Sequence, residues 1–375
     1  MPTISCLAWF AGELYSSAEQ SQTADDCGAD GDHDLHEREN MDKTFKVAVI
    51  GLKGVGTGHT KKLAEMKEVQ LVAVCDMVKE RAEQAAKDFN IPQVFTDYPE
   101  MLKADFEVLV SCTGQYARRD HVVAAAKAGK HIFTEKPLAA NLADGRAIRD
   151  AVKAAGVRYQ IGFQLRCWEH GRALKTVVDS GRLGKIVYGW SHRNMPANHY
   201  KNPDGTQSWY GTQEKSGGIE GDFSPHDIDL MRWFCGDVDE VYARTHRARF
   251  PGASDNVFAI FTFKSGATGT LADSFTNTFG QGFIGVCGTE GTASLDHTGK
   301  VRVKLWADKD FTDPSAYGDL TRGGRLEQHE NFFRDLAEGR DPSPNVDDGF
   351  AVLQISAAIA RSSATGKPVR IADVG

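Results

Sequence analysis

Side chains that could together move a proton lie in two distant segments of the sequence. The segment SPHD (224–227) is typical of a helix start, with Ser224 as the N-cap, proline in the first turn and an acid at the third position. The positive end of the helix dipole favours the neutral imidazole of His226, which is the form that a general base requires. Asp222 could orient that ring and stabilise its protonated form. Lys136 follows an apolar, strand-like run and could relay the proton at the edge of a sheet, where a structural lysine is uncommon.

A second geometry of the same segment is also compatible with the sequence. If the helix begins at Gly218 and bends at Pro225, then Asp222 and His226 lie on one face of it. By themselves, a histidine and an aspartate at a helix start are also typical of simple capping or surface residues. A metal site is not expected here, because neighbouring side chains of a helix point in different directions.

A glycine-containing loop between the first apolar run and the first predicted helix suits a dinucleotide. In GLKGVGTGH (51–59), Gly51 permits a tight turn, and Gly56 permits close packing of the helix on the strand. The helix N-terminus then presents free N–H groups to a pyrophosphate. Lys53 occupies the place of the usual middle glycine, so either Gly54 provides the close approach or Lys53 adds a charge near the phosphates. The predicted contacts are Gly51, Lys53, Gly54, Val55 and Gly56.

An acid at the end of the second apolar run supports the same interpretation. Asp76 follows Gly51 by 25 residues and ends the run QLVAVCD. At that position a carboxylate accepts hydrogen bonds from the ribose hydroxyls of a dinucleotide, and it repels a 2′-phosphate. The sequence therefore predicts NAD rather than NADP, although Asp76 could instead cap the following helix.

The order of apolar runs predicts two domains after an N-terminal leader. Up to about residue 163, continuous apolar runs alternate with helical segments, which is typical of a doubly wound parallel sheet. Beyond it, alternating runs separated by glycines predict a large, mostly antiparallel sheet, and helices near 325–338 and 347–365 close the chain. We therefore expect an α/β protein with a disordered acidic leader (1–43), a Rossmann dinucleotide-binding domain (44–164) and a C-terminal α/β substrate and oligomerisation domain (165–375). The strands expected in the last domain cover 185–194, 238–249, 256–266, 267–275, 283–289 and 300–306.

The formal net charge of −7 belongs almost wholly to the leader. Residues 1–40 hold nine acids and one base, whereas the remaining chain holds 43 bases and 42 acids. Neither part offers the basic surface that nucleic-acid binding requires. No apolar run approaches the ~20 residues of a membrane helix. The sequence thus predicts neither a nucleic-acid partner nor a membrane span.

The leader and the cysteines bear on the cellular compartment. Residues 4–11 are apolar but lack the basic start of a secretory signal. Met41 directly precedes DKTFKVAVIG, so we expect Met41 to be a natural start and residues 1–40 to be an upstream extension. The seven cysteines form no CxxC pair, and several lie inside apolar runs. Reduced, buried thiols in a cytoplasmic protein are the expectation.

Two separated motifs carry a resemblance to a known family. With VAVCD and AGKHIFTEKPLA in the first half and EKSGGIEGDFSPHDIDLMRW (214–233) in the second, the chain resembles the glucose–fructose oxidoreductase / inositol 2-dehydrogenase (Gfo/Idh/MocA) family over about residues 44–370. The resemblance implies a two-domain oxidoreductase that uses a nicotinamide cofactor on a sugar, cyclitol or related polyol. Such proteins often form homo-oligomers through the open face of the second sheet, so a dimer or tetramer is expected.

The resemblance also assigns roles to individual residues. Lys136 matches the lysine that reaches the reacting carbinol, and Pro137 matches a proline that is usually cis. Glu135 matches the residue that holds the nicotinamide ribose. Asp222 and His226 match the acid and the histidine near the substrate, which makes His226 the candidate base.

One loop departs from the family's pattern. Where the family commonly has T-P-N, two residues and a histidine, this chain reads SCTGQYARRDH. We align Gly114 with the proline and Gln115 with the asparagine, with two extra residues before His121. Cofactor contacts at the nicotinamide half are expected from Thr113, Gly114 and Gln115.

Residues on the substrate side are less defined by the sequence. Arg166, just after the last strand of the first domain, suits hydroxyl groups, and Trp209, in a long polar loop, suits the face of a sugar ring. A hinge ion pair and simple loop packing explain them equally well. Asp229 and Arg232 could form an ordinary helix ion pair worth under ~0.5 kcal/mol.

Three functions are compatible with this pattern. The leading hypothesis is an NAD-dependent oxidoreductase that transfers a hydride between nicotinamide and a carbinol of a sugar, sugar derivative or cyclitol. The second is a glycosidase that uses bound NAD in a transient redox step. The third is a nucleotide- or sugar-sensing regulator without turnover, which the presence of Lys136, Asp222 and His226 disfavours.

Overall fold

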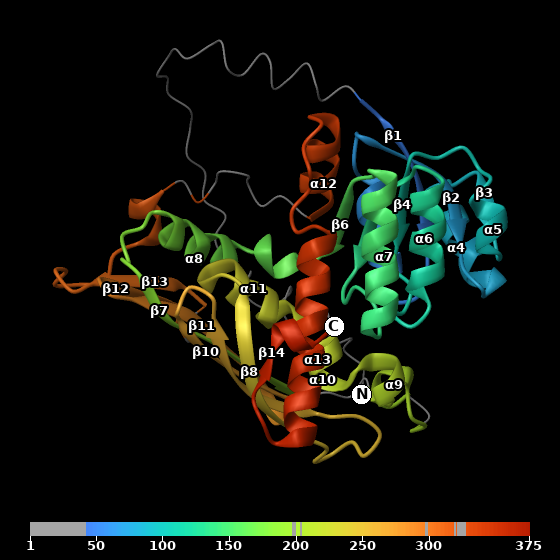
Figure 1. Cartoon of the computed structure of the whole chain (residues 1–375). Coiled ribbons are helices and arrows are strands. Elements are labelled where there is room, and N and C mark those ends of the chain that lie inside the picture. Colours follow the sequence, from blue (N-terminus) through green and yellow to red (C-terminus); the bar gives the residue numbers. More distant parts are fainter. Residues whose placement is uncertain (1–42, 197–199, 203–204, 297–298, 319, 321–327) are drawn as a thin grey trace, which may run out of the picture.

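Two sheets and the helices packed on them make up the protein in the computed structural model (Figure 1). The structure describes residues 43–196, 200–202, 205–296, 299–318, 320 and 328–375. The expectations of a disordered leader and of a start at Met41 lie outside these residues.

The first sheet has six strands in the order β3-β2-β1-β4-β5-β6, and every neighbouring pair in it is parallel. The sheet is doubly wound, as predicted. Its strand order reverses at β1 and β4, and this reversal opens a crevice at the carboxyl ends of these two strands. Its elements are β1 (Phe45–Ile50), α3 (Val55–Ala64), β2 (Val69–Cys75), α4 (Lys79–Phe89), β3 (Gln93–Phe95), α5 (Tyr98–Met101), β4 (Val108–Ser111), α6 (Arg118–Lys127), β5 (His131–Glu135), α7 (Leu142–Ala155) and β6 (Tyr159–Gly162).

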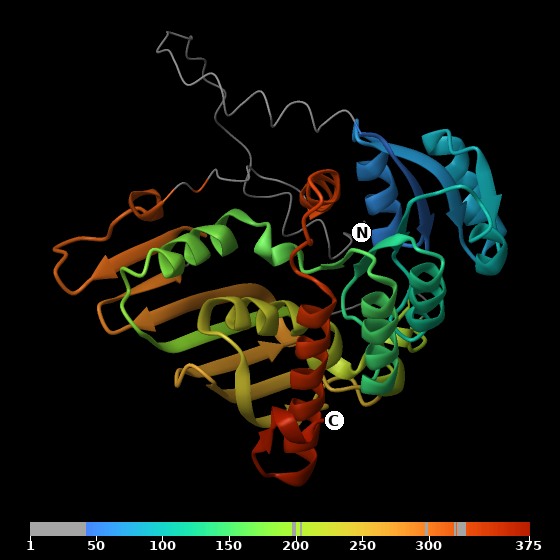
Figure 2. The same cartoon turned by 45° about the horizontal axis from the view of Figure 1, so that its top comes forward.

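Both faces of this sheet are buried, which explains its continuous apolar runs. Along β1, Ala48 and Ile50 belong to one apolar cluster, whereas Val47 and Val49 belong to the other. The second cluster is completed by α12 (Gln328–Ala337), whose Phe332 and other apolar side chains pack on it. A helix from the end of the chain therefore covers one face of the first sheet (Figure 2).

The second sheet has eight strands in the order β13-β12-β11-β7-β10-β9-β8-β14. It is mostly antiparallel, as predicted, but β7 and β10 run parallel, since the long segment between them returns the chain to the same end of the sheet. The prediction missed β12 and β14, and β11 begins earlier than expected. Its strands are β7 (Ile186–Pro196), β8 (Val238–His246), β9 (Asn256–Phe263), β10 (Thr268–Ser274), β11 (Thr276–Gly288), β12 (Gly291–Leu295), β13 (Val301–Leu305) and β14 (Val369–Arg370).

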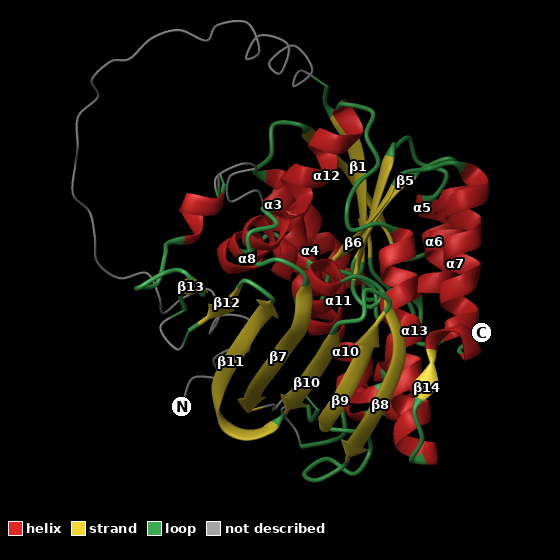
Figure 3. Ribbon diagram, turned by 60° about the vertical axis from the view of Figure 1, so that its left-hand side comes forward, coloured by secondary structure: helices red, strands yellow, loops and turns green. Residues whose placement is uncertain are grey.

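Helices cover one face of the second sheet. Figure 3 looks onto the opposite face, where no described helix lies in front of the strands. The covering helices are α8, α11 and α13, which contact β12 and β13, β7 and β10, and β8, respectively. The bounds of these and the remaining helices are η2 (Gln164–Arg166), α8 (Glu169–Asp179), η3 (Trp209–Gly211), α9 (Gln213–Ser216), α10 (Gly218–Asp222), α11 (Pro225–Cys235), η4 (Pro314–Tyr317), α13 (Val346–Thr365) and η5 (Ile371–Asp373).

Strand β9 is apolar on both of its faces. The run VFAIFTF would suit burial on both sides, but in a single chain the burial alternates along the strand. Val257, Ala259 and Phe261 point into the core, whereas Phe258 is 47% and Ile260 is 50% exposed. The outward face of a sheet with one helical layer is open in a single chain, which is the reason for the difference.

The long helix α13 joins the two halves. It packs on β8 of the second sheet and on α7 of the first domain. A Cβ on Gly145 of α7 would lie 2.4 Å from Leu353, so the glycine permits the close approach of the two helices. A capping box formed by Asn345 and Asp348 fixes the start of α13.

Candidate active site

Lys136 and Asp222 meet where the two halves face each other. Lys136 directly follows β5, and the peptide bond to Pro137 is cis, as expected. The Nζ atom of Lys136 donates a hydrogen bond to the carbonyl oxygen of Asp222 at 2.7 Å and lies 3.4 Å from its Oδ1 atom. The structure thus brings together two residues that are 86 positions apart, at the carboxyl edge of the first sheet.

The segment around His226 forms a bent helix rather than a fresh helix start. Helix α10 ends at Asp222 and α11 begins at Pro225, while Ser224 between them has helical angles. The predicted capping box is wrong, because the Ser224 hydroxyl donates to the Oδ2 atom of Asp273 at 2.5 Å instead of capping the helix. Pro225 has no N–H group to donate, so the chain bends there, close to the second predicted geometry.

His226 lies buried in this segment without a hydrogen bond at one ring nitrogen. Its Nδ1 atom is buried and has no partner among the described residues, and its ring lies 6.2 Å from that of Phe163. Burial, followed by the positive charges of Lys136 and Arg193, holds the pKa of His226 well below its usual value. The imidazole is therefore neutral at physiological pH. The described residues give no hydrogen bond between His226 and Asp222, so the predicted orientation of the ring by this acid has no support here.

A buried polar network that the sequence interpretation missed supports the bend. Asp273 of β10 accepts from the Ser224 hydroxyl and from the backbone N–H of Arg193 at 3.1 Å. Asp227 accepts from Ser191 at 2.7 Å and pairs with the Arg193 guanidinium, which also donates to a backbone carbonyl beside the bend. Burial and the charge of Asp227 raise the pKa of Asp273 well above its usual value. The alternation of the strand could have revealed this residue, since Asp273 follows Leu271 on the inward face.

The glycine loop fits a dinucleotide pyrophosphate. Gly51 has a φ of 86°, and a Cβ there would lie 2.9 Å from the backbone of Thr113. A Cβ on Gly56 would lie 1.8 Å from the carbonyl oxygen of Gly51, so only glycine allows the helix this close to the strand. Gly54 has a φ of 61° and open space in front of it, and α3 has neither a side-chain cap nor an acid in its first turn. The helix N-terminus is therefore free for an anion, with Lys53 exposed beside it and Val55 as the first helical residue.

Asp76 is buried at the end of β2 and already has three protein partners. Its carboxylate accepts from the backbone N–H groups of Leu52 at 2.8 Å and Val78 at 2.9 Å. Arg81 of α4 donates to both of its oxygens at 2.9 and 3.0 Å. The N-cap of α4 is Val78, so Asp76 does not cap this helix. The carboxylate links the glycine loop to β2 at the place where an adenosine ribose is expected.

Glu135 is held by a histidine from α3. The Oε1 atom of Glu135 lies 2.8 Å from Nε2 of His59, and the second ring nitrogen of His59 lies 2.6 Å from His329 of α12. Burial alone would raise the pKa of Glu135, but the hydrogen bond and charge of His59, with Lys136 and Arg118, outweigh it and lower the pKa. The residue is therefore an ionised acceptor, which is the form that binds ribose hydroxyls.

The loop after β4 corrects the alignment made from the sequence. Arg118 follows Gln115 with two residues between them; it is buried and donates to the carbonyls of Thr113 at 2.6 Å and of Pro137. His121 lies one turn later on α6, against Tyr98 and away from the lysine turn. The position of the family's histidine, which we gave to His121 by assuming two extra residues, is therefore occupied by Arg118, and the loop contains no insertion.

The other residues of this loop contact the second half of the protein. The side-chain amide of Gln115 donates to the Ser216 carbonyl at 2.6 Å, so it joins the two halves. A Cβ on Gly114 would lie 2.7 Å from the Tyr116 ring, which folds back over the glycine. Gly114 thus makes room for an aromatic ring, and the cofactor contacts expected from Thr113, Gly114 and Gln115 stay predictions.

Arg166 lies in an ion pair rather than in an open site. Its guanidinium binds both carboxylate oxygens of Asp229 at 2.6 Å, and both side chains are buried. Burial opposes the charge of Arg166, but Asp229 and Asp348 outweigh it and raise the pKa of Arg166. The predicted pair between Asp229 and Arg232 is wrong, because Arg232 pairs with Asp237 at 2.7 Å and with Asp348 at 3.3 Å. Of the two interpretations of Arg166, the structure favours the hinge ion pair.

Trp209 belongs to an aromatic cluster between the two halves. It stacks on Tyr210 with 3.7 Å between ring centroids, and its other neighbour is Tyr116 of the first domain at 5.6 Å. Burial and the charges of Asp222 and Glu135 raise the pKa of Tyr210. Tyr210 therefore lies within electrostatic reach of the lysine turn, and Trp209 lies beside it.

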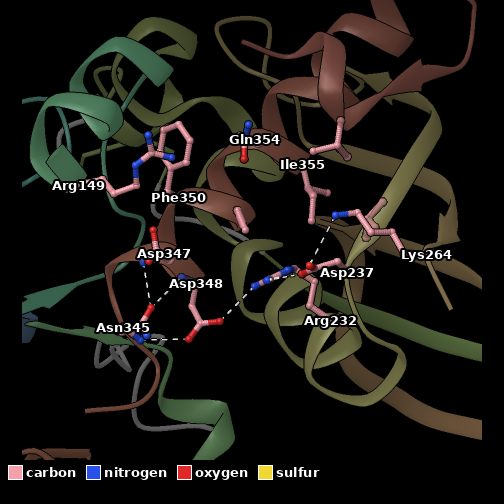
Figure 4. Close-up of a pocket in the computed structure, with 13 residues that line it drawn as sticks. Arg149, Arg232, Asp237, Lys264, Asn345, Asp347, Asp348, Phe350, Gln354 and Ile355 are labelled. Carbon is pink, nitrogen blue, oxygen red and sulfur yellow. Dashed lines mark hydrogen bonds and ion pairs between the residues drawn. The ribbon is translucent and has the colours of Figure 1, made fainter. Parts of the chain in front are cut away.

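A groove of about 370 Å³ lies elsewhere in the protein (Figure 4). It is lined by residues of α7, α11 and the first turns of α13, and its charged side chains pair with each other: Arg232 with Asp237 and Asp348, and Lys264 with Asp237 at 3.8 Å. None of the predicted site residues lines this groove. It offers no unpaired acid or base for the chemistry and is not the candidate active site.

Two general features of the described residues complete the picture. No three histidine, cysteine, aspartate or glutamate side chains in this part of the chain are grouped as a metal site. No helix among these residues is both long and apolar enough to cross a membrane.

Comparison with protein families gives two matches that together span more than half of the chain. Residues 45–163 match the model described as an oxidoreductase family with an NAD-binding Rossmann fold. Residues 172–294 match the GFO/IDH/MocA C-terminal domain. The two matches correspond to the first sheet and to most of the second.

Individual relatives can be aligned with this chain over nearly their whole length. A myo-inositol 2-dehydrogenase from Thermotoga maritima is 27% identical over 346 residues, covering 88% of this chain and 99% of the relative. A scyllo-inositol 2-dehydrogenase (NAD(+)) from Bacillus subtilis is 29% identical over 353 residues, covering 88% and 97%. Among solved structures, a levoglucosan dehydrogenase in complex with NADH has the same fold, with a TM-score of 0.79, 23% identity and coverage of 88% and 99%.

Proposed function

Because the chain belongs to the Gfo/Idh/MocA family of NAD-binding oxidoreductases, we propose that it oxidises or reduces one carbinol of a sugar, sugar derivative or cyclitol. The observation that carries this proposal is the meeting of Lys136 with Asp222 at the carboxyl edge of the dinucleotide sheet. A proton donor or acceptor is thereby fixed beside the crevice in which the cofactor binds.

The cofactor is NAD, and it supplies the hydride chemistry when it is bound. We assign the binding of its pyrophosphate to the glycine loop and the start of α3, where the close approach is open. We assign the adenosine ribose to Asp76 and the nicotinamide ribose to Glu135, since the first carboxylate is buried and the second is 13% exposed, each at the carboxyl end of a strand.

The protein's own contribution is to hold and move one proton. Lys136 is placed to contact the reacting hydroxyl, with Asp222 fixing its ammonium group. His226 is kept neutral by burial and by nearby positive charge, so it can accept the proton that leaves the hydroxyl group. Its Nδ1 atom is buried and has no partner among the described residues, and we assign its unused hydrogen bond to the substrate or to a water beside it.

The substrate class follows from the relatives and from the aromatic cluster. The relatives named above are dehydrogenases of inositols, whose rings have apolar faces between their hydroxyl groups. Trp209 and Tyr116 bring aromatic rings together where the two halves meet, and such rings suit the apolar face of a sugar or cyclitol. We assign Arg166 a structural role instead, because its guanidinium is buried in an ion pair with Asp229.

Incubation of the purified protein with NAD and a panel of inositols, aldoses and anhydrosugars tests the function. We expect absorbance of free NADH to rise with at least one cyclic polyol, and more slowly with NADP. Cleavage of a glycoside without accumulation of NADH would instead indicate the redox-assisted glycosidase. NAD binding without turnover of any panel member or of its oxidised ketone would contradict the proposal.

We also propose that the protein assembles as a homo-oligomer through the open face of the second sheet. Neighbouring strands β8 and β9 expose Tyr242, Phe258 and Ile260 on this face by 37%, 47% and 50%. A contiguous apolar strip of this kind marks an interaction surface. The variant with Phe258→Glu and Ile260→Glu is expected to lower the mass measured by light scattering toward that of one chain, whereas Phe311→Glu, also exposed but after β13, leaves it unchanged. An unchanged mass in the double variant would contradict this assignment.

We place the protein in the cytoplasm on the basis of its thiols. Cys75, Cys112, Cys235 and Cys287 form no disulfide in the structure, and the first two lie beside the glycine loop. A reducing compartment is the environment in which such thiols persist.

A further inference from the structure

Arg118 is a buried cation in the centre of the candidate site. It is the first residue of α6, and its side chain is among the largest fully buried ones of the described chain, with 1% exposed. One guanidinium nitrogen donates to the carbonyl of Thr113 at 2.6 Å, and another donates to the carbonyl of Pro137. These two carbonyls belong to the loop after β4 and to the turn that follows β5, so Arg118 ties together the two loops that border the nicotinamide crevice.

No carboxylate neutralises this cation directly. Among the described residues, Arg118 forms no ion pair, and its Nε atom has no hydrogen-bond partner. Burial of an unpaired charge is costly, and a neutral side chain could satisfy two carbonyls at a lower cost. The free-energy cost of burying this charge therefore indicates that the positive charge itself has a function.

We propose that Arg118 is a positioning residue for the cofactor, which locks the loop after β4 onto the Lys136 turn and, bound to the Pro137 carbonyl two residues after Glu135, holds a permanent positive charge near that ribose carboxylate. This inference rests on the proposed function, because it assigns Glu135 to the nicotinamide ribose. A guanidinium group suits the task, since it remains charged at every physiological pH. It also satisfies two carbonyls at once from one rigid plane.

The surroundings of Glu135 show what the charge offsets. Burial favours the protonated form of this carboxyl group. His59 of α3 contacts it at 2.8 Å, and Lys136 of its own turn, Arg118 of α6 and Tyr210 of η3 are within electrostatic reach of it. The thiol of Cys112, after β4, is also in electrostatic reach. Arg118 is the one cation of this set that neither changes its charge with pH nor is expected to take part in the reaction.

The test is the binding of NAD as a function of pH, measured by calorimetry without substrate. NAD affinity is expected to fall at low pH as Glu135 becomes protonated. In Arg118→Gln we expect the pH at which this acid-side loss occurs to be higher by about one to three units, because Glu135 takes up a proton more readily once the cation is gone. Arg118→Lys keeps a positive charge. We expect its acid-side loss of NAD affinity to move by at most half as much as in Arg118→Gln, on the order of one pH unit or less. Glu135→Gln is the matched control, in which this acid-side dependence is expected to disappear.

The outcomes separate this inference from the proposed function. If the wild-type protein does not bind NAD, the proposed function fails. If it binds NAD and Arg118→Gln has the wild-type pH profile, or if Lys and Gln shift it equally, the charge of Arg118 has no such role. Where Arg118→Gln alone does not give folded protein, the double variant Arg118→Gln/Glu135→Gln decides: recovery of folded protein supports the coupling of the two charges, and a second failure contradicts it.

Discussion

Replacement of Lys136 by methionine is expected to lower kcat by about 10²- to 10⁴-fold, while NAD still binds. Methionine keeps the length and apolar stem of the lysine but cannot hold a proton. The variant also lacks the hydrogen bond that Lys136 Nζ donates to the Asp222 carbonyl, so the two halves lose one polar contact beside the crevice. Steady-state rates with the substrate found in the polyol panel, together with calorimetric NAD binding, measure the two effects separately.

Lys127 offers a matched control for this prediction. It lies exposed on α6 of the same domain and is far from the turn that carries Lys136. Lys127→Met is expected to leave both kcat and NAD affinity unchanged. A kcat of Lys136→Met within threefold of the wild type would remove Lys136 from the reaction.

Replacement of Arg166 by alanine is expected to destabilise the protein by about 3–5 kcal/mol. The change leaves the carboxylate of Asp229 buried without the guanidinium that now binds both of its oxygens. The loss also removes the stacking of Arg166 over Trp233, at 5.2 Å from the ring. Urea unfolding followed by circular dichroism measures the change in the free energy of unfolding.

Two further variants make this prediction specific to the buried pair. Arg166→Met together with Asp229→Leu removes both charges and is expected to recover part of the lost stability. Arg370→Ala breaks a surface pair with Asp239, where both side chains are more than one third exposed, and is expected to cost under about 1 kcal/mol. If Arg166→Ala raised KM for the substrate and left the stability unchanged, the original assignment of Arg166 to the substrate side would be restored.

Local patterns in the sequence predicted most of the fold, because the relevant signals are local. The helix expected over 347–365 is α13 (Val346–Thr365), since local signals mark both of its ends: the capping box of Asn345 at its start and Gly366 after its last residue. The parallel order of the first sheet follows from the alternation of apolar runs and helices. Strands β12 and β14 were missed because five and two residues carry too little periodicity.

The candidate site was predictable where a single position must satisfy a steric or motif requirement. Gly56 is an example, because the requirement for glycine there comes from one carbonyl oxygen 1.8 Å from the place of a Cβ. The partners of Ser224 and Arg166 were not predictable, since Asp273 and Asp229 are brought to them by the tertiary fold from 49 and 63 residues away. A local rule proposed a helix cap for Ser224, and a buried carboxylate from β10 took its hydroxyl group instead.

The return of α12 to the first sheet has a consequence for how the protein is made. Phe332 and Phe333 pack against Phe133 and Phe45, so one face of the first sheet is complete only when residues near the end of the chain are present. On the ribosome, the last strand of the first sheet, which ends at Gly162, is made about 165 residues before α12, which begins at Gln328. Until then the apolar face of the sheet is exposed or is shielded by a chaperone. The dinucleotide-binding half is therefore not a domain that can be moved into another protein by cutting after residue 164, because the cut would remove α12, which covers one face of its sheet.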